Sequence, residues 1–321
     1  MSLLPGATLA YTDTNVMGSM IADVSPQYPA PGEVVTVSLK SYAADLNRTN
    51  IAWSSDGTIF TQGIGLRKVS VRVGPAGSKT NLRASAQTAD GETAIKDLSF
   101  MPAGVTLMFQ AHTSVPPYYP GRALPTTGSS ITILAEPDFV TADGRHLDAA
   151  NLTYDWVRGE SKLESASGYG KYFLDINDLS GLSDETIRVT VTDVSGQLIA
   201  ESRITIPTQK PRLAIYEEDP LQGTKFSTAL SNVYDMLTEE VTLRGEPYFY
   251  PQRARNIFIT WSLNKEPAIT DPENANLITL REAKSQAGSA NLVYAAQTSA
   301  PFVLSLQLPL SVNFGAMRNT F

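Results

Sequence analysis

The chain contains no cysteine, and this absence excludes several kinds of site. Without thiols there is no disulfide bond, no thiolate metal site and no cysteine nucleophile. Histidine is also scarce, with only His112 and His146. A zinc site needs three or four close ligands, and the sequence has neither an HExxH pattern nor two neighbouring histidines. We therefore expect no zinc centre.

Long hydrophobic runs and clusters of positive charge are missing too. No stretch approaches the roughly 18 consecutive apolar residues that a membrane-spanning helix needs. Lys and Arg number 25 against 32 Asp and Glu, a net charge of −7, and no basic run of five or more residues occurs. Since phosphate groups are bound by clustered positive charge, we expect neither nucleic acid nor an anionic membrane surface as a partner.

What is present is the composition of an ordinary folded protein, with 42% hydrophobic and 18% charged residues. A length of 321 residues exceeds the usual size of one hydrophobic core, so two or three domains are expected. Three tryptophans, Trp53, Trp156 and Trp261, are spaced by 103 and 105 residues. Such regular spacing of a rare residue indicates an internal repeat.

The residues around each tryptophan match as well. An apolar residue lies two places before each one, at Ile51, Tyr154 and Ile259, which is typical of a strand with one face inward. Turns at Asp90-Gly91 and Ser195-Gly196 indicate hairpins. The alternating runs before each tryptophan are Val35, Val37, Leu39; Ile131, Ile133, Ala135; and Val241, Leu243, Gly245, and those after it are Leu82, Ala84, Ala86; Ile187, Val189, Val191; and Leu292, Tyr294, Ala296.

The repeat predicts an all-β chain of three tandem immunoglobulin-like antiparallel β-sandwich domains that lack the usual disulfide. We place the domains at 20–103, 104–209 and 210–321, joined by short proline-containing linkers. One segment, Phe226–Leu237, is the best candidate for a short helix.

Residues 1–19 form an N-terminal tail that allows two interpretations. Its "LLPGATLA" resembles the end of a secretory signal, although the basic n-region and a full h-region are missing. Alternatively, Met1–Met20 is a strand donated to another copy of the chain.

The stretch Val115–Ser129, "VPPYYPGRALPTTGS", is rich in proline. It occupies the same place in its module as the segment ahead of Val35 does in the first. Position therefore predicts an edge element across one end of a sandwich, where proline is tolerated because no ladder N–H is needed. The rival interpretation is a polyproline ligand presented by Pro116, Pro117 and Pro120.

Three blocks carry a family resemblance: "PPYYPGRALP" (116–125), "YEEDPLQG" (216–223) and "GEPYFY" (245–250). Together they resemble uncharacterised exported Ig-like or PKD-like β-sandwich surface proteins of ultra-small candidate-phyla bacteria. The likeness covers most of residues 105–314, while the first hundred residues match only as a generic sandwich. The resemblance implies an exported, surface-displayed β protein and no catalytic site.

The sequence offers little for catalysis. A catalytic triad would need His112 or His146 beside an activated serine and a carboxylate, and no GxSxG elbow supplies the nucleophile. We therefore expect no enzyme and no catalytic residue.

Two kinds of binding site stay open. Glu217, Glu218 and Asp219 are weak candidates for a calcium site at a module junction, and Asp175, Asn177 and Asp178 are weaker ones. Tyrosine pairs could also serve as flat platforms for sugars, although tyrosines that fill sandwich ends would look the same. The pairs are Tyr118 and Tyr119, Tyr169 and Tyr172, and Tyr248 and Tyr250.

These observations favour a non-enzymatic, exported cell-surface protein, extracellular or attached to the envelope. It would act as a stalk, adhesion protein or envelope component through contacts with protein or glycan. The alternatives are an array of carbohydrate-binding modules and a self-assembling filament or surface-layer subunit that uses N-terminal strand donation. We expect Trp53, Trp156 and Trp261 to form the structural cores.

Overall fold

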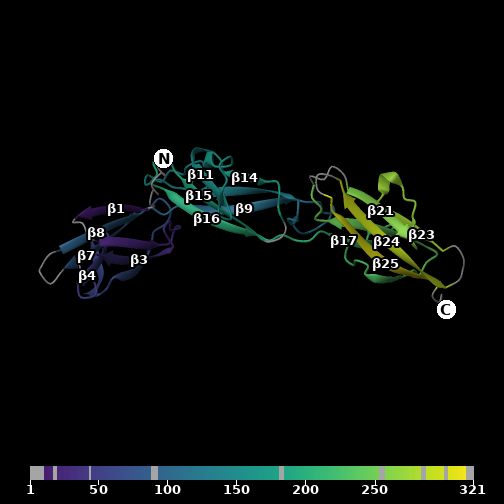
Figure 1. Cartoon of the computed structure of the whole chain (residues 1–321), viewed down its shortest axis with the longest axis horizontal. Helices are drawn as coiled ribbons and strands as arrows, with labels where there is room; N and C mark the ends of the chain where they lie inside the picture. The colour runs from purple at the N-terminus through teal and green to yellow at the C-terminus, as the bar shows by residue number, and fades with distance from the viewer. Residues whose placement is uncertain are drawn as a thin grey trace. The chain divides into compact units, whose positions relative to one another are not determined.

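The computed structural model describes residues 11–16, 20–42, 45–87, 93–180, 184–252, 257–282, 287–299 and 303–315. Almost all of them form strands and turns (Figure 1), and the described residues contain no α-helix, only the single 3₁₀ turns η1 (Ala149–Asn151) and η2 (Pro272–Asn274). The helix predicted at Phe226–Leu237 is wrong, because this segment contains the strand β19 (Asn232–Asp235).

The chain divides into two compact units. Unit 1 comprises Met1–Phe109, Ile133–Leu174 and Thr186–Thr205, and unit 2 comprises Gln110–Thr132, Asp175–Glu185 and Ile206–Phe321. The strands form three successive pairs of sheets, so the predicted fold class, three tandem immunoglobulin-like sandwiches, is confirmed. The first sandwich lies in unit 1 and the third in unit 2, while strands of the second belong to both.

The first sandwich has a three-stranded and a five-stranded sheet, in the orders β2-β3-β6 and β1-β8-β7-β4-β5. Fifteen buried residues form its core around Trp53. The strands are β1 (Tyr11–Val16), β2 (Met20–Ser25), β3 (Val34–Ser41), β4 (Asn50–Ser55), β5 (Thr58–Ile64), β6 (Lys68–Arg72), β7 (Thr80–Gln87) and β8 (Thr93–Phe100).

The second sandwich repeats this order with sheets β14-β10-β9 and β12-β11-β15-β16, and β13 pairs with β11. Trp156, Tyr154 and Ile133 are fully buried. The strands are β9 (Gly104–His112), β10 (Ser130–Asp138), β11 (Thr153–Arg158), β12 (Ser161–Lys162), β13 (Gly168–Tyr169), β14 (Phe173–Ile176), β15 (Glu185–Thr192) and β16 (Ile199–Ile206).

The third sandwich has the sheets β18-β17-β20-β23 and β19-β25-β24-β21-β22. Its core contains Trp261, Leu243, Tyr294 and Leu310. The remaining strands are β17 (Arg212–Asp219), β18 (Gly223–Thr224), β20 (Glu240–Tyr248), β21 (Ile257–Leu263), β22 (Glu266–Pro267), β23 (Leu277–Arg281), β24 (Gly288–Thr298) and β25 (Ser305–Phe314).

Each tryptophan performs the same task in its sandwich. The indole is buried, and its Nε1–H donates to a main-chain carbonyl 13 to 15 residues later, just ahead of the strand that closes the smaller sheet. Burial of the ring thus comes with a satisfied polar group. The acceptors are Leu66 O at 2.8 Å, Lys171 O at 2.8 Å and Ala275 O at 3.0 Å.

The N-terminal tail contributes β1, whose six residues pair antiparallel with the edge strand β8 of the same chain. In the third sandwich the equivalent edge of β25 is covered by β19, which runs parallel to it. Within this chain β1 already has a pairing partner in β8. The hypothesis that the tail is donated to another copy therefore stays a prediction. No helix of the described residues is long and apolar enough to span a membrane.

Candidate functional site

The proline-rich segment Val115–Ser129, called the proline strap below, forms no strand, and the polyproline-ligand interpretation stays a prediction. It consists of turns and irregular backbone with one isolated bridge, from Thr126 to Gln209. Within unit 2 the strap and the residues just ahead of it are attached to residues 249–252 of the third sandwich. Ser114, just ahead of the strap, donates N–H to Tyr250 O at 2.8 Å and accepts from Phe249 N at 2.7 Å. Its prolines explain the lack of a ladder, since proline has no N–H to give.

A buried hydrogen bond anchors the other end of the strap. Thr126 is fully buried, and its Oγ1–H donates to Phe249 O at 2.8 Å. Phe249 itself has a φ of 62°, a left-handed conformation that non-glycine residues adopt at a cost. The main-chain N–H and C=O of Phe249 are thus both hydrogen-bonded to residues more than a hundred positions away in sequence.

The three blocks behind the family resemblance meet at this point. Tyr119 of the strap lies edge-on to Tyr248 and to Phe249, with both ring centroids 5.7 Å away. Tyr216 of β17 lies on the neighbouring strand, and its hydroxyl bonds that of Tyr248 at 2.8 Å. Such aromatic pairs contribute beyond the area they bury. The three blocks, which are far apart in sequence, therefore meet in one aromatic cluster.

A pocket of about 350 Å³ opens between the strap and the outer face of β17 and β20. One ring at its mouth, Tyr118, is 81% exposed and lies 6.2 Å from Phe226. Arg212 also lines it, and none of the ion pairs found among the described residues involves this side chain. The lining residues are Pro116, Tyr118, Tyr119, Pro120, Arg212, Leu213, Ala214, Tyr216, Phe226, Tyr248 and Phe249.

An ionic network lies on the same face of the sheet. Arg244 pairs with Glu218 at 3.0 Å and with Glu246 at 3.3 Å. Glu246 is 7% exposed, and burial raises the pKa of its carboxyl although Arg244 opposes the shift. Burial likewise raises the pKa of the Tyr248 hydroxyl, which shares a hydrogen bond with the hydroxyl of Tyr216.

The calcium candidates are not brought together. Neighbours on a strand point to opposite faces, so Glu217 pairs with Lys225 while Glu218 pairs with Arg244. Asp219 accepts from the backbone of the following turn, which lowers the pKa of its carboxyl. No group of three or more His, Asp or Glu in the described part of the chain could hold a metal ion, and this holds for the weaker candidates Asp175 and Asp178 as well.

The two histidines, where the structure describes them, make contacts other than those of a catalytic triad. His112 Nε2 bonds Thr132 Oγ1 at 2.9 Å, and that hydroxyl donates to Asp175 Oδ1 at 2.5 Å. Since the single hydroxyl proton goes to Asp175, the hydroxyl is not activated by the imidazole, which is the reverse of a catalytic triad. His146 lies in an exposed loop as the partner of Val140 in an isolated bridge.

The tyrosine candidates separate into surface and core. Tyr118, Tyr119 and Tyr248 belong to the pocket, whereas Tyr250 is fully buried and donates to Ala296 O at 3.3 Å, so it is no platform. The second pair lies elsewhere: the hydroxyl of Tyr169 bonds Asn151 Oδ1 at 3.0 Å, and Tyr172 contacts Phe173.

Sequence reasoning missed three members of the site, Arg212, Tyr216 and Phe226. Tyr216 stands in a quoted block, but nothing local indicated its bond to Tyr248. Arg212 opens β17 opposite Tyr248, a register that only the sheet pairing reveals.

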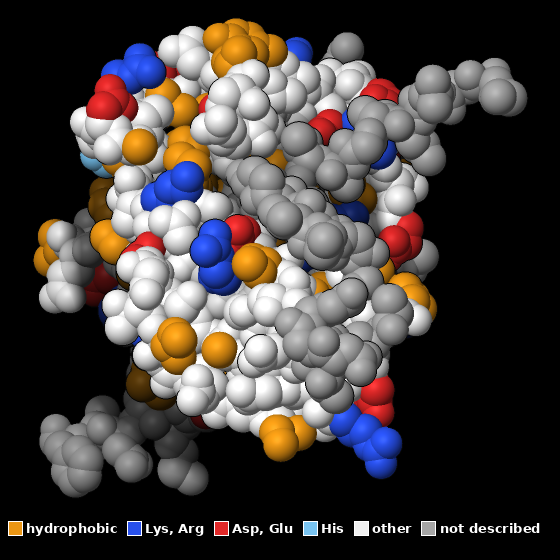
Figure 2. Space-filling model, turned by 90° about the vertical axis from the view of Figure 1, so that its left-hand side faces the viewer, with side chains coloured by type: hydrophobic (Ala, Val, Ile, Leu, Met, Phe, Trp, Pro, Cys, Tyr) orange, Lys and Arg blue, Asp and Glu red, His pale blue; other side chains and the backbone are white. Residues whose placement is uncertain are grey.

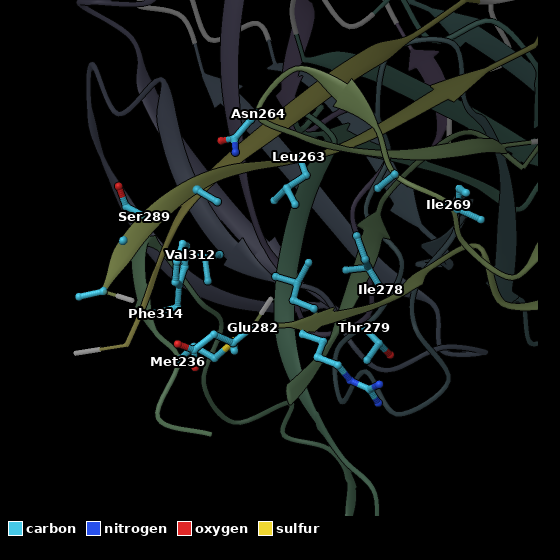
Figure 3. Close-up of a pocket in the computed structure, with 16 residues that line it drawn as sticks. Met236, Leu263, Asn264, Ile269, Ile278, Thr279, Glu282, Ser289, Val312 and Phe314 are labelled. Atoms are coloured by element: carbon cyan, nitrogen blue, oxygen red, sulfur yellow. The ribbon is translucent and has the colours of Figure 1, made fainter. Parts of the chain in front are cut away.

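A second cavity, of about 630 Å³, lies between the layers of the third sandwich (Figure 3). Leu263, Val312 and Phe314 from one sheet and Ile278 from the other surround it, and all four belong to or pack on the core. It is therefore the open end of a hydrophobic core, and the polar residues of its lining are Asn264, Thr279, Arg281, Glu282 and Ser289.

Surface charge is mixed. On the face in Figure 2, basic and acidic side chains lie in small separate groups among neutral surface, and hydrophobic side chains are scattered between them. This distribution agrees with the modest net charge of −7.

No protein-family model matches the chain, and neither does any curated protein. Among solved structures it is similar to three N-terminal domains of the outer capsid protein Hoc of bacteriophage RB49, at 10% identity and a TM-score of 0.27, with 94% of this chain and 99% of that one covered. It is also similar to Sidekick-1 immunoglobulin domains 1–5, at 11% identity and a TM-score of 0.32, covering 94% and 59%. Such low identities and TM-scores lend these likenesses no weight in assigning a function.

Proposed function

We propose that the protein is a non-enzymatic, exported cell-surface component, a stalk, adhesion or envelope protein built from serial sandwiches. The observation that carries the proposal is the repeated construction: three sandwiches, each closed around its own buried tryptophan, follow one another in the chain. Such an architecture supplies length and surface rather than a reaction chamber. Its domain boundaries, 20–103, 104–209 and 210–321, form part of this proposal.

Within unit 2, the strap is fixed to the third sandwich, which suits a protein that bears load. Thr126 Oγ1 donates to Phe249 O in a buried bond, and Tyr250 N donates to Ser114 Oγ, just ahead of the strap, in a partly buried one; these bonds join parts of the sequence 123 and 136 residues apart. Shielded bonds open less often than exposed ones.

The proposal is tested on the source cells. Antibodies raised against the purified chain are expected to label intact cells, and external protease is expected to remove that label. Labelling that appears only after lysis would refute surface display.

A second candidate function, carbohydrate binding, is favoured by the pocket beside the strap. Its volume of about 350 Å³ falls in the range of small-ligand sites, and the exposed ring of Tyr118 offers an apolar face to the C–H groups of a sugar. Arg212, which also lines the pocket, adds a donor fork for hydroxyl or carboxylate oxygens.

A glycan array and titration calorimetry on any hit test this candidate. Tyr118→Ala is expected to weaken binding at least about tenfold, as the loss of one stacking face does. Tyr169→Ala, which removes another exposed tyrosine outside the pocket, is the control. Binding that survives Tyr118→Ala would place the sugar elsewhere, and an empty array would leave the display function without a sugar-binding role.

A further inference from the structure

One sheet edge of the first sandwich differs from its counterparts. After each tryptophan-bearing strand the chain turns back in a tight hairpin, at Asp56-Gly57, Gly159-Glu160 and Asn264-Lys265. In the second and third sandwiches the returning strand pairs over two residues only, Ser161–Lys162 and Glu266–Pro267. In the first it continues as β5, from Thr58 to Ile64.

The two short edges carry the usual protection against stray pairing, whereas β5 does not. A short length, a lysine and a proline all discourage another strand from adding to an edge. The sequence of β5, "TIFTQGI", has no charge and no proline, and its β-branched and aromatic residues favour strands. Within the described residues no strand lies beyond it in the sheet.

The apolar side chains of this edge are also exposed. Ile59, Phe60 and Ile64 are 58%, 47% and 76% exposed. Ile59 pairs with Ser54, and Ile64 pairs with Asn50. Because side chains alternate along a strand, Ser54 and Asn50 lie on the face of β4 opposite to the buried Trp53. Both isoleucines therefore lie on the outer face of the sheet. An uncharged edge with apolar side chains is a template for strand addition.

We infer that β5 is a homotypic docking edge, at which two copies of the chain pair antiparallel into one continuous sheet. The absence of charged residues from β5 argues for a second copy as the occupant. The chain carries a net charge of −7, and at this uncharged edge two copies can meet without placing like charges opposite each other. A two-fold axis at Gln62 places Thr61 of one copy opposite Gly63 of the second copy. The side chains on the outer face of β5 then lie on the same face of the joined sheet in both copies.

A β-bulge sets the extent of this pairing. The register with β4 shifts between Trp53 and Ser54 and leaves Phe60 as the extra residue. Since a bulge bends its strand, the straight part of the edge is Thr61–Ile64. So short a ladder makes a weak, reversible dimer, well below the interface area of an obligate one.

The test uses the full chain at rising concentration in sedimentation velocity. The dimer fraction is expected to rise with concentration, and Gln62→Lys is expected to weaken the dimer at least about tenfold, because two ammonium groups then face each other across the axis. Gln307→Lys, at an exposed glutamine of β25 in the third sandwich, is the matched control.

The absence of cysteine provides a direct readout of register. Gln62→Cys introduces a single thiol into each chain, and under a glutathione redox buffer it is expected to form a disulfide dimer that Gln307→Cys does not form. A chain that stays monomeric up to about millimolar concentration overturns the inference. A dimer that Gln62→Lys leaves intact also overturns the inference. If such a dimer is lost when residues 1–16 are removed, it is formed by exchange of the N-terminal strand instead.

Discussion

Gly245 of β20 faces the ring of Tyr294 across the core of the third sandwich, and replacing it with alanine tests how tightly that core is filled. A Cβ at this position would lie 2.5 Å from Tyr294 Cζ and 2.6 Å from Cδ2, and closer still to Cε2. The ring has no room to retreat, because it is fully buried and packs on Trp261 with centroids 4.6 Å apart. One of the two strands must therefore shift.

Overpacking of this kind costs about 1–3 kcal/mol. For a sandwich of this size that is a fall of roughly 5–15 °C in its melting temperature. Differential scanning calorimetry of the full chain gives the melting temperature, and hydrogen exchange in peptides from β20 and β24 assigns the loss to the third sandwich. Gly63→Ala is the control, since its nearest heavy atom would be Leu66 Cβ at 4.0 Å.

A double variant supplies the decisive comparison. The positions equivalent to Gly245 and Tyr294 in the first sandwich are Leu39 and Ala84, both buried, so the large and small residues are exchanged there. Gly245→Leu combined with Tyr294→Ala is expected to be more stable than either single variant. A Gly245→Ala protein that melts and exchanges like the wild type would refute the reasoning.

Three further outcomes are expected. Trp156→Ala removes the fully buried indole of the second sandwich and is expected to cost about 3–5 kcal/mol, seen as early loss of exchange protection in β11 and β15; unchanged melting would contradict this. Thr126→Val removes the donor to Phe249 O and is expected to cost about 1–3 kcal/mol, read from exchange at residues 247–252. Because burial raises the pKa of folded Glu246, ionising it costs stability as the pH rises above the value of about 4.5 usual for glutamate. Glu246→Gln is accordingly expected to raise the melting temperature at pH 7 and to change it little at pH 4, and a lower value at pH 7 would contradict the assignment.

The fold could be predicted from the sequence because its signals are local. Alternation places Val35, Val37 and Leu39 on one face of a strand whatever lies opposite, and all three are fully buried. The tryptophans were predicted as core residues, and Trp53 and Trp156 are fully buried while Trp261 is 2% exposed. What the spacing did not reveal is the indole hydrogen bond, since its acceptor is a main-chain atom without a side-chain signature.

The errors come from contacts distant in sequence. Phe226–Leu237 has an apolar spacing that resembles a helix, but Asn232 adopts a φ of 59° and the next residues pair with β25 about eighty positions away. Tertiary pairing thus overrides local preference. The strap is a similar case: its place between two strands was predictable, but its attachment to Phe249 and Tyr250 was not.

The indole hydrogen bond has a practical consequence. Where many immunoglobulin sandwiches clamp their two sheets with a covalent sulfur bridge, each sandwich of this chain joins a strand of one sheet to the backbone entering the other through Trp Nε1–H. A bond of this kind is indifferent to electron donors. Millimolar dithiothreitol is therefore expected to leave the melting curve unmoved, and protein made in a reducing bacterial cytosol is expected to need no oxidative refolding.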